Sequence, residues 1–169
     1  NILSSSLGSG ETTLLQITSA YGSFVNGGKK LEPTLVDLIQ DRDGKTLYKN
    51  RKLFCMGCVD EFDIKNPPSL ENRYQRVFNE DVSYQMVNIL KGVVDRGTGK
   101  KLKKLNLELA GKTGTTNDNL DAWFIGFTPE ILVGVYIGFD EPSTLGKKET
   151  GSKAALPIFY DIMKTLKPN

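Results

Sequence analysis

The segment LAGKTGTTNDNLDAWFIGF, residues 109–127, contains side chains that could hold an anion. Lys112 supplies an ammonium with three donors, and the nearby Thr113 and Thr115 add hydroxyl groups. Gly114 lacks a side chain, so another backbone can approach closely at this position. If the segment is a strand at the edge of a sheet, an extended peptide could pair alongside it. The terminal carboxylate of that peptide would then meet the ammonium and the hydroxyls.

The alternation of side chains along a strand limits this interpretation. Lys112 and Gly114 would lie on one face, and Thr113 and Thr115 on the other. Both pairs can serve one site only if the strand borders a cleft and twists there. The plain alternative is a surface strand that leads into a turn.

A phosphate site is the other chemistry that a Gly-Lys-Thr sequence can indicate. The Walker A loop requires a glycine five residues before Gly111, where this chain has Asn106, and Gly44 fails the same test because of Ile39. No GxGxxG match exists either, because Thr13 and Leu102 stand where the third glycine is needed. A P-loop also leads into a helix, whereas this segment is expected between strands. The sequence therefore does not favour nucleotide binding.

The composition excludes several classes of site. Histidine is absent, so the chain holds no Ser–His–Asp triad and no HExxH zinc motif, and a general base must be a lysine, a carboxylate or a tyrosine. The net charge of +2 does not favour nucleic acid. Cys55 and Cys58 form one CMGC pair, which could be inert, a local disulfide, or a metal or redox site. We expect no metal and no cofactor.

The length of 169 residues suits one domain. No apolar run is long enough to span a bilayer, and no leader pattern is visible, so we expect the chain as given to be soluble, although it could be cut from a larger anchored or exported protein. The basic run GKKLKKL, residues 99–105, could contact an anionic lipid or polymer, or could be a solvated loop.

Hydrophobic periodicity predicts an α+β fold in which helices pack on an antiparallel sheet. Helices are expected at residues 11–28, 80–95 and 153–167, a hairpin at 34–50, and strands at 105–115, 121–127 and 131–139, the last of them central. Residues 50–78 are expected to be an irregular, loop-rich insertion. The helix faces predicted to be buried carry Leu14, Ile17, Tyr21, Phe24 and Val25, then Val82, Met86, Ile89, Leu90 and Val93, and finally Ala155, Phe159, Ile162, Met163 and Leu166. Trp123 and Phe124 are assigned to the core, and Thr13, with Gln16, and Asn79 are expected to cap the first two helices.

Five segments that run in the same order resemble the transpeptidase domain of class A (bifunctional) penicillin-binding proteins. They cover most of the chain except residues 50–76. The segments are SLGSGETTLLQITSAYGSFVNGG (6–28), MVNILKGVVDRGTG (86–99), AGKTGTTNDNLDAWFIGFTPE (110–130), VGVYIGFDEP (133–142) and AALPIFYDIMK (154–164). The resemblance implies a partial fold of the penicillin-binding-protein and serine β-lactamase type, with residues 1–169 as the C-terminal part of the domain.

The resemblance also implies roles for the Lys-Thr-Gly segment. In this family a serine attacks a D-alanyl-D-alanine peptide of peptidoglycan, forms an acyl-enzyme and passes the acyl group to an amine, and penicillins acylate the same serine. Lys112 would supply positive potential and help the proton relay, and Thr113 and Thr115 would bind the substrate carboxylate. The Thr115 N–H would be one oxyanion donor, Gly114 would leave the strand open, and Thr116 would shape the same groove.

Two further motifs of the superfamily, S-x-x-K and S-x-N, are missing. None of the serines at positions 4, 5, 6, 9, 19, 23, 69, 83, 143 and 152 has lysine three residues later or asparagine two residues later. We therefore expect this chain to be a C-terminal half that is inactive alone and that self-associates through an exposed sheet face. Alternatives are a non-catalytic binding or assembly module on the same fold and a β-lactamase half. The expected partners are stem peptides and, with the missing half, β-lactams. The expected location is the periplasmic or outer face of a bacterial inner membrane, anchored outside this chain.

Overall fold

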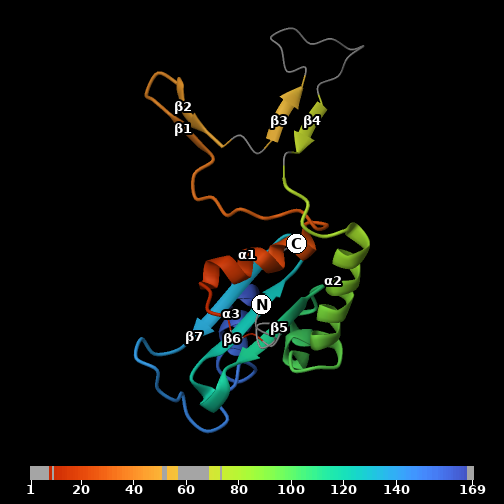
Figure 1. Ribbon diagram of the computed structural model, residues 1–169, viewed down its shortest axis with the longest axis vertical. Helices are drawn as coiled ribbons and strands as arrows, with labels where there is room; N and C mark the ends of the chain where they lie inside the picture. The colour runs from red at the N-terminus through yellow and green to blue at the C-terminus, as the bar shows by residue number, and fades with distance from the viewer. Residues whose placement is uncertain (1–7, 9, 51–52, 57–68, 73, 167–169) are drawn as a thin grey trace.

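A three-stranded antiparallel sheet with helices on both faces forms the body of the molecule (Figure 1). The computed structural model describes residues 8, 10–50, 53–56, 69–72 and 74–166. The sheet consists of β5 (Ala110–Thr115), β6 (Ala122–Phe127) and β7 (Leu132–Ile137), in that order. The strands form the meander that their short connections predicted. The α+β fold class is therefore confirmed.

Glycines on the sheet allow one helix to approach each face. A Cβ at Gly134 would collide with Thr18 of α1 (Leu14–Val25), and a Cβ at Gly126 would lie 2.7 Å from the ring of Phe159 in α3 (Ala155–Leu166). Ile125 pairs with Gly134 and precedes Gly126, so the two glycines belong to opposite faces. Helices thus cover both faces of the described sheet, and the exposed sheet face expected from the sequence is not found.

The apolar strand β7 lies at one end of the described sheet, and β6 is central. Within the described sheet, residues 131–139 do not provide the central strand that their apolar run predicted. The strand is apolar on both sides because α1 packs against one face and α3 against the other. Burial on two faces gives the same sequence pattern as a central position.

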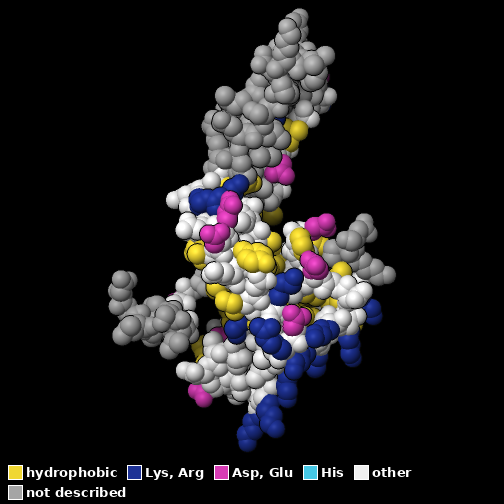
Figure 2. Space-filling view, turned by 90° about the vertical axis from the view of Figure 1, so that its right-hand side faces the viewer, with side chains coloured by type: hydrophobic (Ala, Val, Ile, Leu, Met, Phe, Trp, Pro, Cys, Tyr) yellow, Lys and Arg dark blue, Asp and Glu magenta, His cyan; other side chains and the backbone are white. Residues whose placement is uncertain are grey.

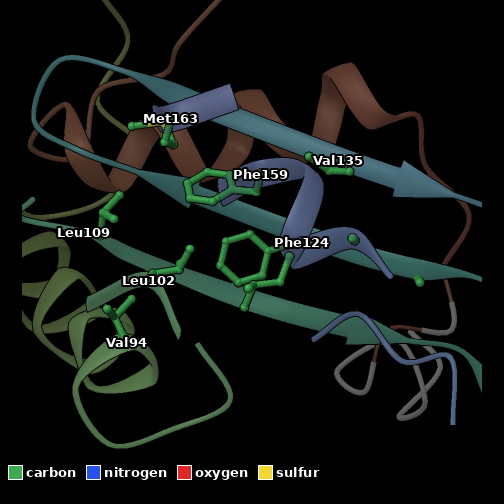
Figure 3. Packing of buried hydrophobic residues seen from close by; sticks show 10 residues of the cluster. Val94, Leu102, Leu109, Phe124, Val135, Phe159 and Met163 are labelled. Atoms are coloured by element: carbon green, nitrogen blue, oxygen red, sulfur yellow. The ribbon is translucent and has the colours of Figure 1, made fainter. Parts of the chain in front are cut away.

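The main core lies between the sheet, α3 and the segment that precedes β5 (Figure 3). The rings of Phe124 and Phe159 have centroids 4.8 Å apart, and both side chains are fully buried. Met163 and Leu102 are also fully buried, and Figure 3 shows them beside these rings. Burying a side chain of this size stabilises the fold by about 1.5–3 kcal/mol. Of the predicted inward residues of α3, Leu166 is the exception, since it is exposed.

The starts of the first two helices differ in how they are capped. Thr13 Oγ1 accepts from Gln16 N at 3.2 Å, and Gln16 Oε1 accepts from Thr13 N at 3.2 Å, so the predicted capping box is confirmed. Asn79 occupies the N-cap of α2 (Glu80–Asp95), but its side chain makes no capping hydrogen bond. The predicted N-cap position is therefore confirmed, but the capping hydrogen bond expected from the Asn79 side chain is not found.

The helix α2 is rotated about its axis relative to the prediction. Leu90 is buried as expected, but Val82 and Ile89 are 43% and 63% exposed. Ser83 and Val94 are buried instead, and the Ser83 hydroxyl donates to a backbone carbonyl of the preceding turn. Counting apolar residues missed this face because a small, hydrogen-bonded serine allows the close packing of α2 on the rest of the fold.

The strand predicted from residue 105 begins only at Ala110, and a short 3-10 helix at Lys100–Leu105 and an irregular stretch at 106–109 precede it. In η2 (Lys100–Leu105), Leu102 is fully buried and the lysines are exposed. Asn106 ends it with a φ of 54°. Leu105 and Leu107 pack against the core, so their alternation reflects anchoring of a short helix and the chain after it. Figure 2 shows Lys and Arg side chains gathered on this side of the molecule.

The hairpin predicted within residues 34–50 is present, and it projects from the body (Figure 1). Its strands are β1 (Leu38–Gln40) and β2 (Thr46–Lys49). The turn includes Gly44, whose φ of +81° favours glycine. All residues of both strands are exposed, so the hairpin adds nothing to the described core.

A second antiparallel pair lies within the segment expected to be irregular. β3 (Leu53–Met56) pairs with β4 (Ser69–Asn72), so the expectation of an irregular course was wrong at these strands. Cys55 lies in β3, and Cys58 lies outside the described residues. The three interpretations of the cysteine pair therefore stay open. Within the described residues, no helix has both the length and the apolar composition needed to cross a bilayer.

Candidate functional site

The Lys-Thr-Gly segment forms most of β5, which is an edge strand of the described sheet. β5 pairs with β6 from Ala110↔Phe127 to Thr115↔Ala122, and no described strand pairs with its other side. Every second residue of an edge strand presents its backbone N–H and C=O away from the neighbouring strand. The edge position that a pairing peptide requires is therefore present.

The ammonium of Lys112 lies against the backbone of β5. Lys112 Nζ donates to the carbonyl oxygen of Thr113 at 2.8 Å, and the side chain is exposed. Among the described residues, no carboxylate forms an ion pair with it. An exposed cation without a neutralising partner at a strand edge can attract an anionic ligand to that edge.

The hydroxyls of Thr113 and Thr115 each have a partner from another segment. Thr113 Oγ1 lies 3.0 Å from Thr98 Oγ1, and Thr115 Oγ1 accepts from Gly151 N at 3.0 Å. Each hydroxyl has one donor and two acceptor positions, so both retain capacity for another partner. The sequence did not identify Thr98 as a site residue, because the segment DRGTG (95–99) indicated only the end of a helix. Gly151 was not identified as a site residue either.

The backbone at Gly114 is approached from two directions. A Cβ at Gly114 would lie 3.0 Å from Trp123 Cβ on the cross-strand neighbour. A Cβ at Gly151 would collide with the backbone oxygens of Gly114 and Trp123. Gly151 therefore lies directly against the β5–β6 ladder, which holds the centre of the Lys-Thr-Gly segment in place.

Trp123 lies outside the main core, next to Gly114. Phe124 is fully buried as predicted, but Trp123 is half-buried, and its ring centroid lies 4.5 Å from that of Tyr136. Tyr136 donates to Asp121 Oδ1 at 2.8 Å. This hydrogen bond, helped by desolvation and nearby carboxylates, raises the pKa of Tyr136 above its ordinary value of 10.0. The two rings form an aromatic surface beside the edge strand.

Thr116 closes the loop that follows β5. Its Oγ1 accepts from Asp121 N at 2.7 Å, and its N–H donates to Asp121 O at 3.1 Å. These bonds enclose the short η3 (Asn117–Asn119) and join the end of β5 to the start of β6. Thr116 is exposed, and in this arrangement its hydroxyl supports the loop.

Two cavities among the described residues lie away from residues 112–116. One of about 210 Å³ is lined by Ala110, Phe127, Val25 and Val87, among others, at the start of β5, and it includes none of residues 112–116. The ammonium, hydroxyls and backbone groups of residues 112–115 thus lie on the edge strand of the described sheet and not in either of these cavities. The chemistry of this edge is that of a backbone ladder, one ammonium and two hydroxyls, which suits an extended peptide with a carboxylate.

An antiparallel sheet covered by helices, with Lys-Thr-Gly on its edge strand, is what the resemblance predicted for a penicillin-binding transpeptidase domain. The chain belongs to this family: the family described as "Penicillin binding protein transpeptidase domain" matches residues 1–164. The chain is 50% identical over 163 residues to penicillin-binding protein 1A of Rickettsia prowazekii, covering 93% of this chain and 20% of that protein. It is 38% identical over 164 residues to penicillin-binding protein 1A of Neisseria gonorrhoeae, covering 96% and 18%.

Solved structures agree with this assignment. The crystal structure of penicillin-binding protein 1A from Haemophilus influenzae matches with a TM-score of 0.82 and 28% identity, covering 98% of this chain and 28% of that one. PonA1 from Mycobacterium tuberculosis in complex with penicillin V has the same fold, with a TM-score of 0.70 and 21% identity, covering 98% and 41%. The chain spans about a fifth of the length of the curated relatives that it matches.

Proposed function

We propose that this chain supplies the substrate-binding edge strand of a serine-type D,D-transpeptidase that crosslinks peptidoglycan, within a bifunctional parent protein. The carrying observation is the edge position of β5, with the Lys112 ammonium 2.8 Å from the Thr113 carbonyl. Membership of the transpeptidase family supports the same proposal. The donor is an extended stem peptide ending in D-alanyl-D-alanine, and a β-lactam takes its place during inhibition.

Alternation along β5 assigns the backbone contacts. Gly151 lies over the backbone oxygens of both Gly114 and Trp123, which are cross-strand partners. This supports an arrangement in which the backbone N–H and C=O of Gly114 form hydrogen bonds with β6. Thr113 and Thr115 then present their backbone groups to the open edge. In the proposal, Thr115 N–H stabilises the oxyanion and its carbonyl binds the substrate amide. Gly114 keeps a side chain out of the path of the peptide.

Charge and hydroxyl groups hold the other end of the peptide. The substrate carboxylate accepts hydrogen bonds from the hydroxyls of Thr113 and Thr115 in this proposal. Thr115 accepts from Gly151 N and keeps its proton for the ligand, and Thr113 can donate when it accepts from Thr98. Lys112 supplies positive potential at the edge and takes part in proton movement around the nucleophile. Hydrogen bonds that involve an ionised group are the stronger kind, so these contacts orient the carboxylate firmly.

The attacking serine, its lysine and the serine of S-x-N come from a part of the protein outside this chain. None of the serines in the chain has the required spacing to lysine or asparagine. The isolated chain therefore forms no acyl-enzyme in this proposal. The parent protein acts at the periplasmic or outer face of a bacterial inner membrane, held by an anchor outside this chain.

Covalent labelling with a fluorescent penicillin tests the proposal on the full-length protein. We expect one labelled serine, and we expect Lys112→Ala to lower the acylation rate by at least about 10², the size of effect seen when an electrostatic stabiliser is removed. Lys45→Ala, an exposed lysine of the hairpin turn, is the matched control and should label at the normal rate. The isolated chain should give no covalent band.

Two results would contradict the proposal. A full-length protein that never acquires label would instead favour a non-catalytic binding or assembly module on this fold. Equal labelling rates of the Lys112→Ala and Lys45→Ala proteins would show that the Lys112 side chain of β5 has no role in the reaction.

A further inference from the structure

The turn between α2 and η2 places a hydroxyl against the Thr113 side chain of the Lys-Thr-Gly segment. Thr98 Oγ1 lies 3.0 Å from Thr113 Oγ1, although the two residues are 15 positions apart in the sequence. Thr98 is exposed and Thr113 is half-buried. The pair therefore lies at the surface of the molecule, beside β5.

Two glycines hold Thr98 in this position. Gly97 N and Gly99 N both donate to Val93 O, at 3.1 and 2.9 Å. A Cβ at Gly97 would lie 2.9 Å from the backbone of Val93, and one at Gly99 would lie 3.2 Å from it. A side chain at position 97 would have to displace the backbone of Val93, and one at position 99 would make a tight contact, so both glycines suit the close return of the turn onto the end of α2. The backbone thus places the Thr98 hydroxyl beside β5.

We propose that Thr98 is a positioning residue that sets the direction of the Thr113 hydroxyl proton. This inference rests on the proposed function, in which Thr113 donates to the substrate carboxylate. A hydroxyl has a single proton, so Thr113 can donate to the carboxylate only if it accepts in its bond with Thr98. Thr98 therefore donates to Thr113, and Thr113 donates to the carboxylate.

The order of donors in this series of hydrogen bonds, from Thr98 to Thr113 to the carboxylate, strengthens binding. A hydroxyl that accepts one hydrogen bond becomes a better donor in the next one, because the two bonds polarise each other. Removing Thr98 leaves the Thr113 proton free to rotate away from the ligand. The hydrogen bond from Thr113 to the substrate carboxylate is then weakened, while the other contacts of β5 are unchanged.

A double-mutant cycle on the full-length protein tests this role through the acylation rate with a fluorescent penicillin. Thr98→Val should slow acylation by about five- to tenfold, the effect of one neutral hydrogen bond. Thr113→Val should slow it by about 10–100-fold, because its bond reaches a charged group. If Thr98 acts through Thr113, the double variant should be no slower than Thr113→Val alone.

Further variants separate positioning from general damage. Thr98→Ser keeps the hydroxyl and should restore the normal rate. Thr165→Val removes an exposed hydroxyl that donates to Asp161 O in α3, far along the chain from β5, and should have no effect. Thr98→Ala removes the hydroxyl without adding an apolar branch, and it replaces Thr98→Val if that protein folds in low yield.

The outcomes distinguish this inference from the function on which it rests. If the unsubstituted protein does not react with penicillin, both proposals fail. If it reacts but the two substitutions act additively, or Thr98→Val has no effect, the positioning role of Thr98 fails and the proposed function stands.

Discussion

Replacing Gly151 with alanine tests how closely the turn before α3 is pressed against the β5–β6 ladder. The added Cβ would collide with the backbone oxygens of Gly114 and Trp123. Both oxygens belong to paired strands, so no rotation of a side chain can relieve the contact. The turn must move away, which also breaks the 3.0 Å hydrogen bond from Gly151 N to Thr115 Oγ1.

The magnitude follows from three contributions. Overpacking costs about 1–3 kcal/mol, and the lost hydrogen bond adds about 1 kcal/mol. The backbone of Gly151 lies outside the positive-φ region, so alanine is compatible with it and stabilises by about 0.4–1 kcal/mol through the unfolded chain. The net expectation for Gly151→Ala is a loss of about 2 kcal/mol in the free energy of unfolding.

Urea unfolding of the chain measures this loss, with Trp123 as the reporter because it is the single tryptophan. A loss of about 2 kcal/mol should lower the midpoint by about 1 M. The matched control is Gly10→Ala, since a Cβ there meets nothing within 4 Å. If the midpoints of the two variants agree, the close contact between Gly151 and the ladder does not exist in solution. In the full-length protein, Gly151→Ala should also slow acylation, because Thr115 loses its support.

Three further predictions concern the core, pH dependence and association. Leu102→Ala empties a fully buried position and should cost about 2–5 kcal/mol, measured from the same urea midpoints; a loss below 1 kcal/mol would contradict the anchoring of η2. Because the pKa of Tyr136 is raised, the native state keeps this proton when the unfolded chain loses it above about pH 10. This contribution to stability is complete below about pH 10 and is lost as the pH rises through the folded pKa. Tyr136→Phe should therefore weaken the loss of stability at alkaline pH in unfolding scans, and an unchanged dependence of stability on pH would contradict the bond to Asp121. The isolated chain should self-associate, since Leu15 and Phe139 are 62% and 56% exposed, and light scattering that shows a monomer at high concentration would refute this.

Local sequence signals predicted the elements that carry their own start, stop and turn residues. The capping box at Thr13 began α1 as expected, and Gly44 lies in the turn of the first hairpin. The strands of the meander were also recognised, because their apolar runs and short connections leave few other arrangements. Five collinear segments indicated the family, which the comparison over residues 1–164 shows.

Other features depend on packing between distant segments, which periodicity does not encode. The buried face of α2 includes Ser83, because its hydroxyl finds a backbone carbonyl. Trp123 was assigned to the core because it is large and apolar, but it lies beside Gly114 and Tyr136 on the other side of the strand from Phe124. The strand pair β3–β4 also went unrecognised, since polar residues and prolines dominate the intervening sequence.

The groups available to the site can be read directly from the residues: an ammonium, two hydroxyls and a residue without a side chain on one strand. How those groups are supported depends on contacts that form only in the folded chain. Thr98 and Gly151 reach β5 from positions 15 and 36 residues away from their partners. Such contacts depend on chain folding over long separations, and a hydrogen bond between distant residues leaves no periodic trace in a single sequence.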